Sequence, residues 1–192
     1  MPPKKQYSRE EIVDTAFGLA KKEGIEGISI RKVADKLGSS IAPIYVNFDN
    51  VQELKQAVVD KVFAISKKYY DSSESGSPLD VGIASLRFAK EYSAIFRDLV
   101  MKKNDYMKNY EKADLEILGK ELAKYPELKD FTEEEIKDML FKMRVFQLGL
   151  SVMAANGLFA EEPTEEELIA MLDSAGNDVI TAIRWRKKEK GC

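Results

Sequence analysis

Apolar residues recur at helical spacing along nearly the whole chain, and no stretch shows the strict alternation of a β-strand. The first apolar stretch follows Ser8-x-x-Glu11, a capping-box pattern, and stops at Gly24. Helical patterning resumes after Gly24 and continues almost to the last residues. The sequence therefore predicts an all-α fold.

Residues 29–48 predict two short helices joined by a tight turn. Gly38 can adopt the left-handed backbone that ends a helix, and the hydroxyl of Ser39 or Ser40 would cap the next one. Such a helix-turn-helix can place its second helix in a DNA major groove, although an ordinary helical hairpin shares the local pattern. The first helix has a narrow apolar stripe formed by Ile30, Val33, Ala34 and Leu37.

Five longer helices are predicted after residue 50, each from a capping pattern, a proline or a polar break. The segment 71–77 is polar and reads as a loop. The expected helices cover about 53–69, 78–100 with a bend near Ser93, 106–124, 132–157 and 164–187.

The residue types that are missing narrow the possible chemistry. The 192 residues include no histidine and a single cysteine, Cys192. Histidine- or cysteine-based metal sites, histidine-dependent catalysis and internal disulfides are thereby excluded, and no nucleotide-cradling glycine loop occurs. We therefore expect no catalytic residues, no metal and no cofactor, with a carboxylate-dependent helical enzyme as a third-ranked hypothesis.

Charge does not point to nucleic-acid binding by itself. The net charge is −3, and residues 1–54 hold eight basic and eight acidic side chains. Any DNA contact must therefore come from the local placement of cations. The start of the chain is polar, and the most apolar stretch, 139–159, is interrupted by charged residues, so we expect no membrane span and a reducing, cytoplasmic setting.

Residues 8–54 resemble the TetR family of bacterial transcriptional regulators. The resemblance rests on the capped first helix, the Gly24 stop, SIRKVADKLGSS and the pattern A-P-x-Y-x-N-F. Departures are Asn47 where the family usually has histidine, Val51 where a lysine often contacts phosphate, and Ile41 in place of a basic or polar residue. The resemblance implies a DNA-binding domain over 1–52 and an effector-binding and dimerisation domain over 53–192.

The same resemblance implies the DNA contacts. Ser29 and Arg31 would meet one phosphate and Tyr45 another, while residues 39–42 would face base edges. Hydroxyls can contact several bases, and Ile41 and Ala42 suit thymine methyl groups. A basic N-terminal arm including Arg9 is as compatible with the sequence as a disordered tail. The full candidate set is Ser29, Arg31, Ser39, Ser40, Ile41, Ala42, Pro43, Tyr45, Asn47, Lys4 and Lys5.

The resemblance also implies that the C-terminal helices bind an effector, which we expect to be small and apolar or aromatic, and that the last two helices pair in a homodimer. Effector binding would shift the helix at 53–69 and change the spacing of two recognition helices on operator DNA. A repressor is the leading hypothesis, and a helical ligand-binding or adaptor protein with a degenerate helix-turn-helix is the alternative. Pocket candidates, each equally compatible with plain core packing, are Phe88, Tyr92, Phe96, Tyr106, Tyr110, Met143, Phe146 and Met153.

Overall fold

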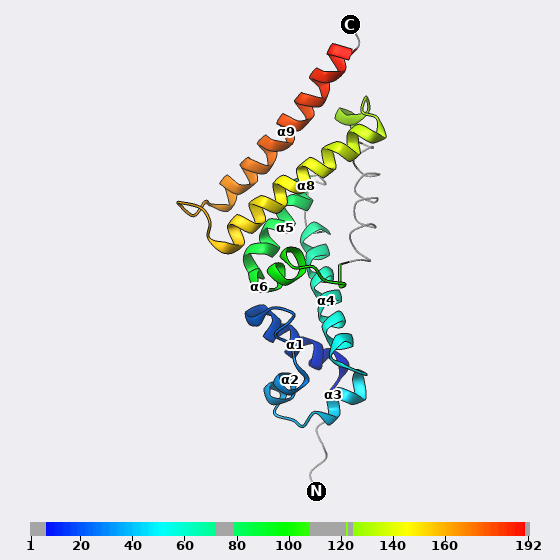
Figure 1. Cartoon of the computed structure of the whole chain (residues 1–192), viewed down its shortest axis with the longest axis vertical. Coiled ribbons are helices and arrows are strands. Elements are labelled where there is room, and N and C mark those ends of the chain that lie inside the picture. The colour runs from blue at the N-terminus through cyan, green and yellow to red at the C-terminus, as the bar shows by residue number, and fades with distance from the viewer. Residues whose placement is uncertain (1–6, 72–78, 108–121, 123–124, 191–192) are drawn as a thin grey trace. The chain divides into compact units, whose positions relative to one another are not determined.

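The computed structural model describes residues 7–71, 79–107, 122 and 125–190, and these residues form helices, turns and loops with no β-strand (Figure 1). The predicted all-α fold is confirmed. The first helices are α1 (Arg9–Glu23), α2 (Ile30–Leu37), α3 (Ala42–Asn47) and α4 (Val51–Asp71). Those that follow are α5 (Leu79–Glu91), α6 (Ser93–Phe96), the π-helical turn η1 (Arg97–Met101), the 3₁₀ turn η2 (Pro126–Leu128), α8 (Glu133–Asn156) and α9 (Glu165–Lys190).

Side-chain caps start the longer helices where the sequence predicts them. The Ser8 hydroxyl accepts a hydrogen bond from the Glu11 N–H at 3.1 Å, and the Glu11 carboxylate accepts one from the Ser8 N–H at 2.8 Å. The same reciprocal pair opens α8 and α9. At α4, the Asn50 side-chain oxygen accepts from the N–H groups of Gln52 and Glu53 at 2.9 and 3.0 Å. Local sequence therefore sets these helix starts.

The start of α3 differs from the prediction. It begins at Ala42, and the residue before it, Ile41, makes no side-chain cap. The Ser39 hydroxyl instead donates to the Ser40 carbonyl at 2.9 Å, so neither serine caps the helix. Pro43 explains the shift, because proline has no N–H to donate and its fixed φ favours the first helical turn.

The predicted single helix over 78–100 is divided. The backbone breaks at Tyr92 (φ −121°, ψ 45°), which confirms the bend expected near Ser93. After α6 the chain widens into η1, where the Asn104 side-chain amide lies 2.8 Å from the Leu99 carbonyl oxygen. The amide therefore donates a hydrogen bond to a carbonyl that would otherwise have no partner at the end of the helix.

The helix predicted over 106–124 lies mostly outside the described residues. Its first two residues, Tyr106 and Met107, form a turn, and Tyr125 precedes η2. No described helix is long and apolar enough to cross a membrane.

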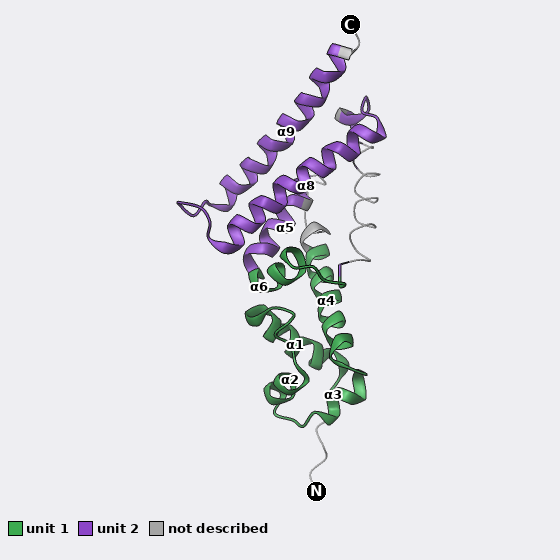
Figure 2. Cartoon of the chain, in the orientation of Figure 1, with its two compact units in different colours: residues 1–69, 92–106 green, residues 70–91, 107–192 purple. Residues whose placement is uncertain are grey.

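The described chain divides into two compact units (Figure 2). Unit 1 comprises residues 1–69 and 92–106, and unit 2 comprises residues 70–91 and 107–192. The expected boundary after residue 52 falls at the start of α4, within unit 1. As a boundary between DNA-binding and effector-binding functions, it stays a prediction.

Unit 1 has an apolar core built from α1, α2, α3 and α4. The core face of α1 includes Ile12 and Ala16, both fully buried, and the α2 stripe buries Val33. Phe48, between α3 and α4, is 1% exposed and belongs to this core. Burial of these side chains holds the short helices α2 and α3 in place, because helices of six or eight residues are not stable alone.

Unit 2 contains two apolar clusters along α8. One lies around Ile136, Met139 and Ile183, and the other joins Leu86 of α5 to Leu150 of α8, with Leu168 and Leu172 of α9. Where α5 meets α8, the Gln147 amide lies 2.5 Å from the Ser85 hydroxyl oxygen and 2.9 Å from that of the buried Ser151. This polar contact fixes the register of the two helices within an otherwise apolar interface.

Candidate nucleic-acid interface

Two residues just before and at the start of α1 hold the helix-turn-helix together. The Tyr7 hydroxyl donates to the Leu37 carbonyl at the end of α2, at 2.6 Å. Arg9 donates to the Asn47 carbonyl at 2.5 Å and to Glu53 Oε1 at 2.9 Å, with its guanidinium 4.1 Å from the centre of the Phe48 ring. Arg9 therefore does not extend from a free N-terminal arm, as expected from sequence, but ties α3 and α4 to α1.

The Glu53 carboxylate is held ionised by this arrangement. The Asp49 N–H donates to its other oxygen at 2.8 Å, and this bond, followed by the bond from Arg9, lowers the pKa of Glu53 below its ordinary value. The carboxylate thus neutralises Arg9, so this arginine adds little positive potential to the surface around α3.

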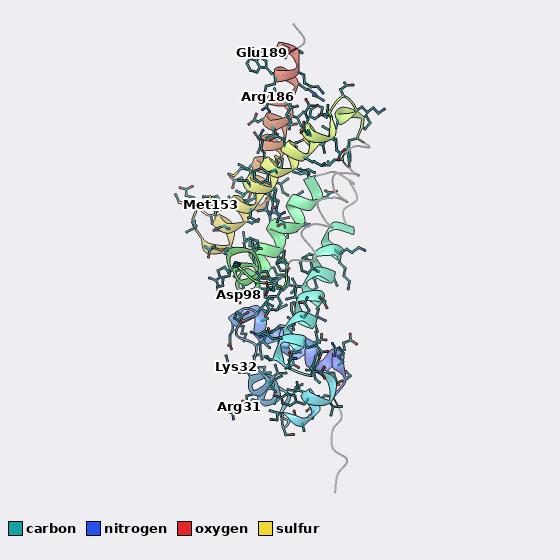
Figure 3. The ribbon with its side chains drawn as sticks, turned by 45° about the vertical axis from the view of Figure 1, so that its right-hand side comes forward. Arg31, Lys32, Asp98, Met153, Arg186 and Glu189 are labelled. Carbon is teal, nitrogen blue, oxygen red and sulfur yellow. The ribbon has the colours of Figure 1, made fainter. Side chains whose placement is uncertain are left out.

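The exposed cations of α2 differ in whether they have partners. Lys32 forms an ion pair with Glu23 and approaches the Gly27 carbonyl. Arg31 and Lys36 are exposed and make no hydrogen bond or ion pair with any other described residue. Figure 3 shows Arg31 and Lys32 projecting from α2. Arg31 and Lys36 are the α2 cations whose charge is available to a phosphate.

The Ser29 hydroxyl caps α2, accepting from the Lys32 N–H at 3.3 Å, as predicted. Gly38 ends α2 in the left-handed conformation (φ 66°), also as predicted. The tight turn between α2 and α3 is therefore present in the structure, and it joins the two helices as a helix-turn-helix.

The outer side of α3 is exposed and uncharged. Ser40, Ile41 and Ala42 are exposed, and so are Tyr45 and Val46 on the next turn. The Tyr45 hydroxyl makes no hydrogen bond with any described residue. A phenolic hydroxyl in this state can donate to a phosphate oxygen.

Two other predicted contact residues lie partly inside the unit. Pro43 is half-buried, and the Asn47 amide donates to the Pro43 carbonyl at 2.9 Å and lies 3.4 Å from the Tyr7 carbonyl. Asn47 therefore closes α3 onto the N-terminal segment through its side chain. The remaining two predicted contacts, Lys4 and Lys5, lie outside the described residues.

A buried polar network lies at the other side of unit 1, where the loop after α1 meets η1. The Asp98 carboxylate is 7% exposed and accepts from the Glu26 N–H at 3.1 Å, and Lys102 pairs with it at 2.6 Å. Gly24 (φ 79°) lies so close that an added Cβ would overlap the Asp98 carboxylate. The carboxylate thereby locks the loop after α1 onto η1.

The same network continues to α4. The buried Lys55 ammonium pairs with Glu26 at 2.6 Å, which offsets the cost of burying its charge. The Tyr106 hydroxyl lies 3.0 Å from Gln52 Oε1 and 3.4 Å from Glu26 Oε1. Partial burial, followed by the nearby Glu26 charge, raises the pKa of Tyr106 to about 12. Helix α4 and η1 are thus both joined to the loop after α1 within unit 1.

The predicted pocket residues are distributed over both units. Tyr92 and Phe96 are buried in unit 1, where the Tyr92 ring lies 5.6 Å from that of Phe17. In unit 2, Phe88 is buried, while Phe146 and Met153 are exposed on α8. Met143 is half-buried beside the core of unit 2, Tyr106 belongs to the network above, and Tyr110 lies outside the described residues. Two hollows on the described surface are lined by other residues, and the predicted pocket stays a prediction.

No protein-family model matches the chain. The HTH-type transcriptional repressor DrrR1 of Streptomyces coeruleorubidus is 30% identical over 92 residues, 48% of this chain and 31% of that repressor. The HTH-type nicotine-responsive transcriptional repressor HdnoR of Paenarthrobacter nicotinovorans is 35% identical over 49 residues, 26% of this chain and 25% of that protein. The matched stretches thus span under a third of the length of these relatives.

Solved structures match over a much greater length. The fatty acid degradation regulator FadR of Bacillus halodurans superposes with a TM-score of 0.64 at 14% identity, covering 92% of this chain and 97% of FadR. A TetR protein of Acinetobacter baumannii AYE, solved with minocycline, gives 0.60 at 13% identity over 93% and 97% of the two chains. The chain has the TetR-family fold. A TetR-family regulator of Rhodococcus sp. agrees, with a TM-score of 0.56 at 19% identity over 90% and 97%.

Within this TetR-family fold, α2 and the Gly38 turn were predicted from the sequence, while the phosphate contact of Tyr45 stays a prediction. Sequence reasoning missed Val46, the most exposed large apolar side chain of the described residues. It also missed Tyr7, which bonds to the end of α2, and Lys55 and Asp98, which hold Glu26 in the loop after α1. For Asp98, an acid within an apolar helical segment was the available signal, but its partner Glu26 is 72 residues away.

Proposed function

We propose that this chain is a TetR-type transcriptional repressor that binds operator DNA as a homodimer and acts in the cytoplasm. The observation that carries the proposal is the free outer side of the helix-turn-helix. Arg31, Lys36 and the Tyr45 hydroxyl have no partner among the described residues, and α3 beside them is exposed. Cations and hydroxyls in this setting hold phosphates, while the second helix of the motif reads bases. The repressors named above support this function.

The homodimer is supported by an exposed apolar stripe on α8. Phe141 and Val145 are 66% and 58% exposed, and they are four residues apart, on one face of the helix. Trp185 of α9 is 59% exposed beside a shallow hollow that α9 forms with Lys142 of α8. Exposed apolar side chains on this scale are typical of a surface that another chain covers. A second copy of the chain, packing its own α8 and α9 against this surface, would bury these apolar side chains.

A small apolar or aromatic effector would control operator binding. The chemistry of two similar proteins supports this, since HdnoR is nicotine-responsive and the Acinetobacter TetR was solved with minocycline. The effector would bias α4, which pairs through Lys55 with Glu26 in the loop after α1 and through Lys61 with Asp14 of α1. Helix α1 in turn packs against α2 and α3. Recognition helices must lie about 34–36 Å apart to enter successive major grooves, so a small shift of α4 releases one half-site.

Fluorescence anisotropy with the 192-residue chain tests the DNA-binding function. Labelled duplex from the DNA beside its own gene is compared with a scrambled duplex at two salt concentrations. We expect tighter, salt-sensitive binding to the native duplex. Equal weak binding to native and scrambled duplexes, repeated with neighbouring promoters, would reject the proposal. Addition of a panel of aromatic compounds, nicotine and minocycline among them, then tests for effector release.

A matched pair of variants on α2 tests the phosphate contact. Arg31→Ala should weaken binding to every duplex by a similar factor and reduce the salt dependence by about one unit of slope per subunit. Lys32→Ala is the control, because Lys32 is already paired with Glu23 and should change the slope less. If Arg31→Ala leaves both the affinity and the salt slope unchanged, Arg31 does not contact DNA.

The second candidate function is a ligand-binding or adaptor protein whose helix-turn-helix does not read DNA. The observation that favours it is the absence of any cation on α3, together with the balanced charge of residues 1–54. The combined variant Arg31→Ala with Tyr45→Phe separates the candidates. A DNA reader loses affinity for all duplexes, whereas an adaptor has no duplex affinity to lose.

A further inference from the structure

The side of α3 that faces away from the core has only apolar groups at its centre. Ile44 is fully buried beneath the helix. At about 100° per residue, Ala42 and Val46 lie on the opposite side, one turn apart. Val46 is 80% exposed, more than any other large apolar side chain of the described residues. The part of α3 that would reach farthest into a groove therefore offers no hydrogen bond.

We propose that Ala42 and Val46 read the 5-methyl groups of thymines in the major groove, with Val46 as the main determinant. This inference rests on the proposed DNA-binding function and identifies the base chemistry that the same helix recognises. Among the four base pairs, the thymine methyl is the one apolar group presented in the major groove. An exposed valine next to an alanine matches that group and offers nothing to the donors and acceptors of guanine or cytosine.

The distribution of charge supports duplex DNA as the occupant of this face. Residues 42–47 contain no charged side chain, so α3 cannot make the common bidentate arginine or lysine contact to guanine. Two cations of α2, Arg31 and Lys36, have no partner among the described residues and can hold the phosphate backbone instead. Helix α2 would therefore position the protein on the phosphate backbone, and α3 would read the bases through apolar contacts.

The spacing on α3 limits which thymines can be read together. Ala42 and Val46 are separated by about 6 Å along the helix, at 1.5 Å per residue. Successive bases on one strand are about 3.4 Å apart, so the two contacts span about two base steps. Each half-site should therefore contain two thymines within about two steps, with two-fold symmetry between the half-sites.

The experiment begins with selection of binding sites from a random duplex library by the 192-residue chain. In the selected site, each thymine is replaced in turn by uracil, which removes the methyl group and nothing else. We expect about a fourfold loss of affinity at each contacted thymine, from the value of one buried methyl group. Symmetric replacement in both half-sites should multiply the two losses.

Combining base and protein changes assigns the contact to Val46. Val46→Ala should bind the thymine duplex several-fold more weakly, and uracil at the contacted position should then cost nothing further. Lys36→Ala is the control, since loss of a phosphate contact weakens thymine and uracil duplexes alike. Because Val46 is exposed, its replacement leaves the core of unit 1 intact, which thermal unfolding of the variant verifies.

The outcomes separate this inference from the proposed function. Specific binding that is indifferent to uracil, or a Val46→Ala protein that still discriminates thymine from uracil, overturns thymine reading while leaving the repressor intact. Absence of specific binding by the wild-type chain to any duplex overturns both. Loss of binding to a protein partner on Val46→Ala, without a DNA effect, would assign this face to the adaptor function.

Discussion

Gly24 and Gly38 show, at the residue scale, how different the demands on two glycines can be. Both have positive φ, but Gly24 (φ 79°, ψ 175°) is in a region that essentially only glycine adopts, and it abuts the Asp98 carboxylate. Gly24→Ala should lower the free energy of unfolding by about 3 kcal/mol or more, because backbone strain and overlap add. Gly38→Ala has open space and should cost only about 1–2 kcal/mol. Chemical denaturation compares them, and equal losses would contradict the role of Asp98.

Tyr106 gives a pH dependence at alkaline pH. Its pKa is raised to about 12 in the folded chain, whereas a phenol in an unfolded chain titrates near 10. Between these values the unfolded chain has already lost the proton that the folded chain retains. The contribution of Tyr106 to stability is therefore complete below about pH 10 and is lost as pH rises toward about 12.

The measurement for Tyr106 is the free energy of unfolding of wild type and Tyr106→Phe, each at a pH below and a pH within this window. Lysines also titrate there, but they are common to both proteins and cancel in the comparison. We expect wild type to lose more stability than the variant on going to alkaline pH. Parallel losses would place the hydroxyl in solvent rather than beside Gln52 and Glu26.

At the element scale, η1 is a short π-helical turn whose end is held by one side chain. The Asn104 amide lies within 3.2 Å of the carbonyl oxygens of Asp98, Leu99 and Lys102. Asn104→Ala should lower the free energy of unfolding by about 1–2 kcal/mol, because partly buried carbonyls lose their donor. Asn104→Asp keeps the size but places a carboxylate among carbonyls, so it should cost more. Unfolding curves of the two variants check the order, and the reverse order would mean that packing, not donation, is what Asn104 supplies.

The starts of α1, α8 and α9 were predictable because a capping box brings its two partners within three residues. The start of α3 was not, because Ser39 and Ser40 are both plausible caps and only the placement of Pro43 in the first turn excludes them. The break before Ser93 was predicted, but the π-helical turn η1 was not, and its Asp98 is bonded to Glu26, which is 72 residues away in the chain.

At the scale of the whole molecule, the exposed stripe on α8 predicts an oligomer that one residue can disrupt. Val145→Glu would place a charge at the centre of an apolar interface and should convert a dimer into monomers. Operator affinity should then fall by about 100-fold or more, since two half-sites are no longer engaged together. Ala160→Glu, an exposed change in the loop between α8 and α9, is the control of equal charge.

Analytical ultracentrifugation of the two variants and wild type checks the oligomeric state. A wild-type chain that is monomeric at micromolar concentration, or a Val145→Glu chain that remains dimeric, would contradict pairing through this face. A dimer that Val145→Glu dissociates without changing operator affinity would separate dimerisation from DNA binding.

The sequence by itself determined the all-α class, most helix limits and the location of the helix-turn-helix, because caps, glycine stops and apolar periodicity act over one or two turns. Only the tertiary structure decided which polar side chains have no partner within the chain and can therefore bind a ligand. Arg9 and Asn47 were expected at the DNA-facing surface, but they bond to partners 38 and 40 residues away, and the 80% exposure of Val46 was not anticipated. Exposure and long-range pairing depend on how helices pack, and no local pattern encodes that.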